Sequence, residues 1–318
     1  MRLATIDIGT NTAQLLVAEV NEDEEGPKLK RLHVGERFVR LGEGVDANGH
    51  INTDAQRRLL HAIQEHVDTA RSYNAEEITA VGTSALRDAA NRRAVCIRVA
   101  REGGIPIETL SGEEEALWSF AAARAPFADQ SEPCLVVDIG GGSLELVAGT
   151  LDPSAEHPKE AVRGRTSLDL GCVRLTERFF SSHPPAASTV QQLTEHIDGA
   201  LAPLTLPVGS DAMTIGTAGT ATALALVNDG PTSTWDPLDG NGFTLPAATV
   251  REWCERLCTL SLDDIRALHP AAMEGRADVF PVGVLLLDRV LQRYDRAACV
   301  VSPYELRHGL ALRMIHPG

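Results

Sequence analysis

The sequence has few aromatic residues and very few lysines. Phenylalanine, tryptophan and tyrosine make up 4% of its 318 residues, which argues against a protein that stacks single-stranded nucleic acid on aromatic side chains. Lysine occurs only at positions 28, 30 and 159, so arginine carries nearly all of the positive charge. The formal net charge is −15, which argues against a nucleic-acid-binding domain with an electropositive surface.

Long apolar runs and paired cysteines are also missing. No stretch approaches the roughly 20 apolar residues of a membrane span. The first apolar run ends at Asp7, too early for the stretch of about 7–15 residues in a signal peptide. The six cysteines form no C-x-x-C pair and are expected to be reduced core thiols. We therefore expect a cytoplasmic protein that binds neither nucleic acid nor a membrane.

Several catalytic signatures are absent as well. His61 and His66 do not form the H-E-x-x-H pattern of a zinc protease. No G-x-S-x-G nucleophile elbow occurs, and no glycine-rich stretch continues into the Gly-Lys-Ser/Thr of a Walker A loop. There is also no His-Asp dipeptide of the kind found in one class of metal phosphohydrolases.

What remains is an ordinary globular composition, with 43% hydrophobic and 23% charged residues. The length suggests two domains of roughly 150 residues each. Short β-branched runs alternate with longer helical patterns, which is typical of α/β architecture. The predicted early elements are strands over 3–8, 14–20, 77–81 and 105–110, and helices over 53–73, 84–102 and from 111 onward. The segment Thr53-Asp54-Ala55-Gln56 fits a capping box, so Thr53 is expected to cap the first of these helices.

An internal repeat supports two related domains. The segment 7–17, Asp-Ile-Gly-Thr-Asn-Thr-Ala-Gln-Leu-Leu-Val, resembles the segment 138–147, Asp-Ile-Gly-Gly-Gly-Ser-Leu-Glu-Leu-Val. Each copy has an apolar strand, an aspartate, a glycine-containing turn and another strand. The polar, proline-flanked segment 126–133 is a plausible boundary between the copies.

Three loops have the small residues that suit phosphate binding. Glycines allow backbone N–H groups to approach an oxyanion closely, and such a turn follows each repeated aspartate at Gly9-Thr10-Asn11-Thr12 and Gly140-Gly141-Gly142-Ser143. A third loop, Gly216-Thr217-Ala218-Gly219-Thr220, precedes an alanine-rich helix, whose N-terminus suits phosphate. The alternatives are tight hairpin turns for the first two loops and ordinary strand-to-helix packing for the third. Together, the three loops favour a phosphate cleft between two domains.

A run of acids starts the helix at residue 111. Ser111 and Glu114 fit the S-x-x-E capping box, so capping accounts for Glu114 but not for Glu115. A carboxylate close to bound phosphates has a raised pKa, which suits a general base; the alternative is a solvated first-turn acid. Arg87, in the strand-to-helix turn that begins at Thr83, can fork two phosphate oxygens, or it can form a surface ion pair.

Taken together, these motifs resemble the exopolyphosphatase / guanosine pentaphosphate phosphohydrolase family. The matching segments run in family order along essentially the whole chain: 7–12, 83–89, 111–116, 138–145, 167–176, 216–220, 275–278 and 306–307. The resemblance implies an α/β, two-domain actin-like ATPase fold, also called the ribonuclease H-like or sugar kinase–heat-shock–actin fold, with an interdomain cleft and a five-stranded sheet in each domain. The expected domains are residues 1–125 plus 304–318, and residues 126–303.

The resemblance also implies the roles of the site residues. Glu115 takes the catalytic-base position, and Arg87 takes that of the phosphate-clamping arginine. The implied metal ligands for Mg²⁺ (or Mn²⁺) are Asp138, Glu145 and Asp7. The implied phosphate-binding residues are Gly9, Thr10, Asn11, Thr12, Thr83, Gly140, Gly141, Gly142, Ser143, Gly216, Gly219 and Thr220. Two positions depart from the family pattern: Gln14 replaces an arginine or histidine, and His308 replaces a glutamate.

The expected reaction is hydrolysis of the terminal phosphoryl group of inorganic polyphosphate. Longer family members carry appended domains, so the length of this chain favours shorter polyphosphates. The alternative within the family is removal of the 5′ γ-phosphate of guanosine pentaphosphate. A small-molecule kinase and a non-catalytic nucleotide-binding protein of the same fold are more distant alternatives. The sequence leaves the oligomeric state open, with a homodimer among the alternatives.

Overall fold

The computed structural model describes residues 1–23, 26–127, 132–151, 157–233 and 243–315. The chain folds as two compact units. Unit 1 combines Met1–Trp118 with Leu306–Gly318, and unit 2 is the continuous stretch Ser119–Glu305. The first division falls inside helix α5 (Gly112–Arg124). Residues 128–131 of the expected boundary segment lie outside the described residues.

Unit 1 is built on a five-stranded sheet with the order β3-β2-β1-β4-β5. Its strands are β1 (Arg2–Ile8), β2 (Thr12–Asp23), β3 (Gly26–Phe38), β4 (Glu77–Gly82) and β5 (Ile107–Thr109). The first three strands form an antiparallel meander, whereas β4 and β5 continue the sheet in parallel to β1. The four predicted strands of this part of the chain are confirmed, although β2 is longer than predicted and β5 is shorter.

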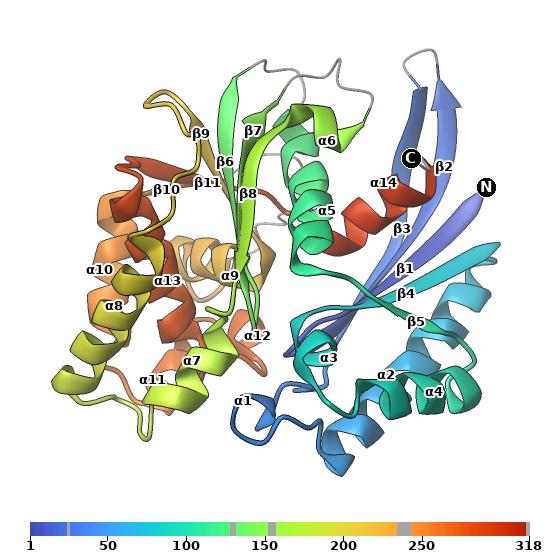
Figure 1. Ribbon diagram of the computed structural model, residues 1–318, viewed down its shortest axis with the longest axis horizontal. Coiled ribbons are helices and arrows are strands. Elements are labelled where there is room, and N and C mark those ends of the chain that lie inside the picture. Colours follow the sequence, from blue (N-terminus) through green and yellow to red (C-terminus); the bar gives the residue numbers. More distant parts are fainter. Residues whose placement is uncertain (24–25, 128–131, 152–156, 234–242, 316–318) are drawn as a thin grey trace. The chain divides into compact units, whose positions relative to one another are not determined.

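Helices cover both faces of this sheet, as Figure 1 shows, with α2 and α4 on one face and α14 on the other. The helices of unit 1 are α1 (Val45–Asn48), α2 (Thr53–Ser72), α3 (Ser84–Asp88), α4 (Arg92–Glu102), the start of α5 and α14 (Leu306–Ile315). Ala311 of α14 packs against Leu3 and Leu16 of the sheet. The Thr5 hydroxyl donates to the carbonyl oxygen of Arg307 at 2.7 Å, which attaches α14 to β1.

Two helix predictions in unit 1 need correction. The cap of α2 is Asn52 and not Thr53, because the Asn52 side chain accepts the Ala55 N–H at 2.8 Å. The helix predicted over 84–102 is two helices, because Ala89 has an extended backbone with φ −74° and ψ 126°. Asn91 follows this break, and its side chain bonds both the N–H and the carbonyl oxygen of residue 51, at 3.0 and 2.9 Å.

Unit 2 is built on a six-stranded sheet with the order β10-β11-β9-β6-β7-β8. Its strands are β6 (Pro133–Ile139), β7 (Leu144–Thr150), β8 (Val162–Leu168), β9 (Met213–Thr217), β10 (Phe243–Pro246) and β11 (Ala298–Val301). Five of them, β8-β7-β6-β9-β11, repeat the order and directions of β3-β2-β1-β4-β5. The predicted repeat is therefore confirmed, while the implied five strands are exceeded here by β10, an antiparallel edge strand.

The helices of unit 2, except the short α6, bury one large apolar core against this sheet. They are α6 (Pro158–Ala161), α7 (Cys172–Phe179), α8 (Ala187–Leu201), α9 (Ala218–Asp229), α10 (Ala247–Leu257), α11 (Leu262–Leu268), α12 (Pro270–Met273) and α13 (Phe280–Arg293), with a 3₁₀ turn at Ala125–Phe127. Helix α13 is buried along most of its length, which explains why its sequence is apolar on nearly every side.

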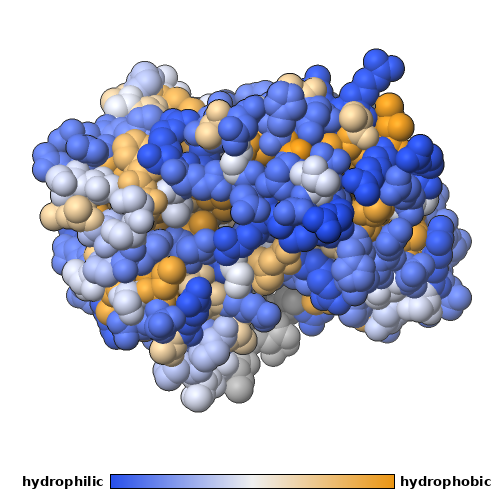
Figure 2. Space-filling view, turned by 90° about the horizontal axis from the view of Figure 1, so that it is seen from below, coloured by the Kyte–Doolittle hydropathy of each residue, from blue (hydrophilic) through white to orange (hydrophobic). Residues whose placement is uncertain are grey.

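The surface is mostly hydrophilic on the face shown in Figure 2, where apolar residues form separate small patches. Among the described residues, the large apolar side chains that are exposed are Met1 and Ile97. None of the described helices combines the length and the apolar composition that a membrane crossing requires.

Candidate active site

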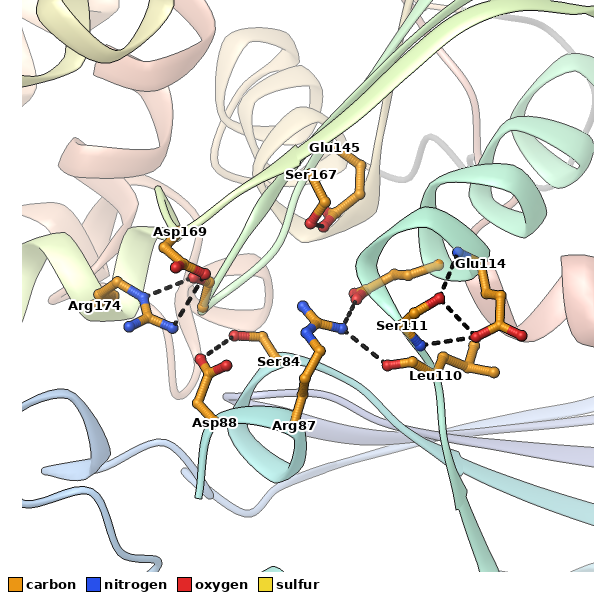
Figure 3. Close-up of polar contacts among 12 residues, drawn as sticks. Ser84, Arg87, Asp88, Leu110, Ser111, Glu114, Glu145, Ser167, Asp169 and Arg174 are labelled. Atoms are coloured by element: carbon orange, nitrogen blue, oxygen red, sulfur yellow. Dashed lines mark hydrogen bonds and ion pairs between the residues drawn. The ribbon is translucent and has the colours of Figure 1, made fainter. Parts of the chain in front are cut away.

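Three successive glutamates start helix α5, and only the third is buried. Ser111 and Glu114 form the predicted capping box: the Ser111 N–H donates to Glu114 Oε2 at 2.9 Å, and the Glu114 N–H donates to Ser111 Oγ at 3.2 Å (Figure 3). Glu113 and Glu114 are exposed, whereas Glu115 is 7% exposed. Capping thus explains Glu114 and leaves Glu115 for another role.

The Glu115 carboxylate is held by the guanidinium of Arg87, which comes from α3. Arg87 Nη1 donates to Glu115 Oε2 at 2.9 Å and to the carbonyl oxygen of Leu110 at 3.1 Å. Burial raises the pKa of Glu115, although the charge of Arg87 and hydrogen bonds from Arg87 and Thr83 oppose the increase. The expected direction of the pKa shift is therefore present, but burial and not bound phosphate causes it.

The first glycine-containing loop is a tight turn between β1 and β2. The Gly9 N–H donates to the carbonyl oxygen of Thr12 at 2.8 Å, so the hairpin interpretation of this loop is confirmed. The carbonyl oxygen of Asn11 accepts the N–H groups of residues 39 and 40, and that of Thr10 accepts the N–H of residue 42, at 2.8 to 2.9 Å. These bonds fix the loop from the segment that follows β3, and its phosphate-binding role stays a prediction.

A row of polar side chains crosses the unit 1 sheet next to this loop. Asp7 on β1 pairs in register with Gln14 on β2, which pairs with Glu36 on β3. Gln14 Nε2 lies 3.5 Å from Glu36 Oε1. Because paired residues project from the same face of a sheet, Gln14 lies beside Asp7.

The corresponding row in unit 2 contains two buried carboxylates. Asp138 on β6 pairs in register with Glu145 on β7, Thr217 on β9 pairs with Asp138, and Ser167 on β8 pairs with Glu145. Asp138 is 7% exposed and Glu145 is 1% exposed. The Ser167 hydroxyl donates to Glu145 Oε1 at 2.7 Å, a contact visible in Figure 3. The strand register therefore brings Asp138 and Glu145 together on one face of the sheet.

This pair of carboxylates fits a hard divalent cation. Mg²⁺ in phosphate-processing enzymes typically binds one or two carboxylates, together with water and phosphate oxygens. Within the described ranges, no group of three or more His, Cys, Asp or Glu residues has the arrangement of a metal site. The donor set of Asp138 and Glu145 thus suits a hard divalent cation, and it does not match the four-ligand cage of structural zinc.

The second glycine loop connects β6 to β7. It is closed by a hydrogen bond of 3.0 Å from the Gly140 N–H to the carbonyl oxygen of Ser143, so it too is a hairpin turn. Gly171, at the start of α7, approaches it so closely that a Cβ at position 171 would lie 2.2 Å from backbone atoms of Gly141 and Gly142. The loop and the start of α7 are therefore packed backbone to backbone.

The third loop begins later than predicted, because strand β9 continues through Thr217. Gly216 lies inside this strand, between β6 and β11. Helix α9 starts at Ala218, whose φ of 64° lies in the left-handed region that alanine rarely adopts. The carbonyl oxygen of Gly219 accepts Arg276 Nη1 at 3.2 Å, and Thr220 is buried.

Three side chains around these loops have no individual role in the sequence-based prediction. They are Ser167, which bonds Glu145; Arg174, which bonds the Gly142 carbonyl oxygen; and Arg276, which bonds the Gly219 carbonyl oxygen. All three lie in segments that resemble the family motifs, at 167–176 and 275–278. The signal was thus present in the sequence, but their partners become evident only with the strand register and the loop geometry.

Comparisons with known sequences give a consistent result. A family model described as the Ppx/GppA phosphatase family matches residues 16–317. Exopolyphosphatase 2 from Mycobacterium tuberculosis is 33% identical over 326 residues, which cover 98% of each chain. Exopolyphosphatase 1 from Mycobacterium bovis is 31% identical over 318 residues, covering 99% of this chain and 88% of the relative.

Solved structures agree with the sequence matches. The Ppx/GppA family member from Aquifex aeolicus is 26% identical, with a TM-score of 0.78, and the match covers 99% of this chain and 97% of that chain. An exopolyphosphatase from Cytophaga hutchinsonii is 25% identical, with a TM-score of 0.88, and the match covers 99% and 98%. The predicted α/β fold of the actin-like ATPase type, with two domains, is confirmed.

Proposed function

Because the chain belongs to the Ppx/GppA phosphatase family, we propose that it removes the terminal phosphoryl group of inorganic polyphosphate as orthophosphate. The family and the exopolyphosphatase relatives support a hydrolase of phosphoanhydride bonds. The observation that carries the proposal is Glu115: capping does not use this buried carboxylate, and it lies 2.9 Å from the guanidinium of Arg87.

Glu115 is the general base of this proposal. It orients a water molecule and accepts its proton as the water oxygen attacks the terminal phosphorus, and the bond from that phosphorus to the bridging oxygen breaks. A carboxylate with its pKa raised above the ordinary value is a stronger base than an ordinary surface glutamate. Burial provides this increase before any substrate is present.

Arg87 and the backbone loops supply positive charge and N–H donors to the transferring phosphoryl group. Phosphoryl transfer depends mainly on positioning and on stabilising the charge of the equatorial oxygens. A guanidinium matches two phosphate oxygens through parallel N–H donors. We assign this role to Arg87, and we assign backbone donation to Gly9–Thr12 and Gly140–Ser143.

Asp138 and Glu145 would hold the divalent cation. When bound, Mg²⁺ neutralises charge on the phosphate oxygens as the phosphoanhydride bond breaks. Ser167 keeps Oε1 of Glu145 in a fixed position through its 2.7 Å hydrogen bond. Removing either carboxylate is expected to weaken Mg²⁺ binding, and isothermal titration of the variants with MgCl₂ measures this loss directly.

The decisive test compares two neighbouring glutamates. Glu115→Gln is expected to lower kcat for phosphate release by roughly 10²- to 10⁴-fold, the usual contribution of a general base. Glu114→Gln is the matched control, since glutamine also completes a capping box. Near-normal phosphate release by the Glu115→Gln enzyme would overturn the assignment of the base.

The choice of substrate requires its own comparison. Polyphosphates of defined length, guanosine pentaphosphate and ATP are compared by kcat/KM under one set of conditions. The proposal expects the highest value for polyphosphate, whereas a higher value for guanosine pentaphosphate would assign the chain to the other activity of its family. ADP formation that depends on a small acceptor would indicate a kinase instead.

A further inference from the structure

The glycine loop at 140–143 is fixed from one side by the first turn of α7. The N–H of Cys172 donates to the carbonyl oxygen of Gly140 at 3.0 Å. The N–H groups of Val173 and Arg174 both donate to the carbonyl oxygen of Gly141, at 2.8 and 3.1 Å. The first turn of a helix has N–H groups without partners in the helix, and here two loop carbonyl oxygens provide those partners.

The Arg174 side chain extends this pattern to the next peptide. Its Nε–H donates to the carbonyl oxygen of Gly142 at 2.9 Å, and the side chain is 13% exposed. Arg174 Nη2 also lies 3.9 Å from Asp169 Oδ1, and the Asp169 side chain is 75% exposed (Figure 3). An ion pair of this kind with an exposed partner contributes little, whereas the hydrogen bond to Gly142 is made by a largely buried side chain.

These contacts determine the direction of the N–H groups in the loop. In a trans peptide, the carbonyl oxygen and the following N–H point in opposite directions. Since the carbonyl oxygens of residues 140–142 all face α7, the N–H groups of Gly141, Gly142 and Ser143 face away from it. Successive N–H groups that point the same way form an anion-binding nest.

We infer that Arg174 is a positioning residue, which aims the Ser143 N–H at the transferring phosphoryl group by fixing the carbonyl oxygen of Gly142. This inference rests on the proposed function, because it assigns the loop a phosphate substrate. The role requires arginine, since its Nε–H is a donor in a rigid plane, whereas the lysine ammonium is a flexible point charge. Arg174 does not itself touch the substrate in this assignment.

Kinetics of the variants Arg174→Ala and Arg174→Lys test the inference. Both are expected to lower kcat on polyphosphate by roughly 10- to 100-fold while KM changes little, because loop N–H donors act mainly in the transition state. Methylguanidine in the buffer should restore part of the kcat of the alanine variant. Arg178→Ala is the matched control, since Arg178 is an exposed arginine on the same helix. If the alanine variant does not fold, the lysine variant decides the outcome.

A second measurement, by NMR spectroscopy, tests phosphate binding by the loop without substrate turnover. In the wild-type protein, titration with orthophosphate should shift the amide NMR signals of Gly141, Gly142 and Ser143, and in Arg174→Lys the shift of Ser143 should be lost. If the wild type shows the shifts but does not hydrolyse polyphosphate, the loop assignment stands and the proposed function fails. If Arg174→Lys keeps the wild-type kcat and the Ser143 shift, the positioning role is wrong.

Discussion

The contact between α7 and the glycine loop gives a sharp prediction for Gly171→Ala. Gly171 has φ −83° and ψ 152°, an ordinary extended conformation, so alanine brings no backbone strain at this position. The added Cβ would, however, lie 2.2 Å from the C and O atoms of Gly141 and the N atom of Gly142. Non-bonded carbon contacts are normally near 3.5 Å, and backbone atoms cannot rotate away. The loop and the helix must therefore separate by roughly 1 Å.

This displacement is expected to affect both stability and catalysis. Overpacking of this kind costs about 1–3 kcal/mol, and a shift of about 1 Å in a catalytic group can lower the rate by about 100-fold. Thermal melting measures the stability, and phosphate release from polyphosphate measures kcat. We expect a folded protein with a lower Tm and a kcat reduced by roughly 100-fold.

Gly199→Ala is the matched control. Gly199 lies in α8 of the same unit, and a Cβ there would meet no atom within 4 Å. Alanine is favoured over glycine in a helix by up to about 1 kcal/mol, so this variant should be at least as stable as the wild type and fully active. If Gly171→Ala keeps a kcat within about threefold of the control, far from the 100-fold loss, the close backbone approach does not position the loop.

Three further predictions concern Glu115, Ala218 and Ser167. Burial raises the pKa of Glu115. The stability of the wild type relative to Glu115→Gln should therefore be greatest at pH values below the usual pKa of a glutamate, and it should decrease as the pH rises through the folded-state pKa. Tm differences between the two proteins that stay constant between pH 4 and 8 would contradict this. Ala218→Gly relieves a positive φ and should raise the stability by about 0.5–1 kcal/mol. The control Ala100→Gly, in the exposed part of α4, should lower the stability by about 1 kcal/mol. Chemical denaturation measures both changes. Ser167→Ala removes the hydrogen bond to Glu145 and should weaken Mg²⁺ binding roughly 10-fold, which calorimetric titration detects; an unchanged affinity would show that the hydroxyl does not orient the carboxylate.

The elements that the sequence predicted well are those whose signal is local. The strand at the N-terminus, the helix over 53–73 and the capping box of Ser111 and Glu114 each depend on a few neighbouring residues. The repeat around Asp7 and Asp138 predicted two related domains, and the matched order of strands in the two sheets agrees with that prediction. Capping logic further distinguished Glu115 from Glu114, and burial agrees with that choice.

The remaining features depend on contacts between distant segments. Asn52 replaces Thr53 as the cap of α2 because its side chain reaches Ala55, and both residue types are good caps. The third loop begins after Thr217, because β6 and β11 pair with Gly216 on both sides and β6 also pairs with Thr217. Arg174 could not be assigned to the loop, since its partner lies 32 positions earlier in the chain.

The discontinuity of unit 1 has a consequence for folding during synthesis. Its sheet is encoded at the start of the chain, but helix α14, which covers Leu3 and Leu16, follows only after all of unit 2. At about 5–20 residues per second, the ribosome needs roughly 10–40 s to reach α14 after it completes the first segment of unit 1. During this interval, one apolar face of the first sheet lacks its native cover while the continuous second unit can already fold. We therefore expect the uncovered face of the nascent N-terminal sheet to be a binding surface for chaperones during translation.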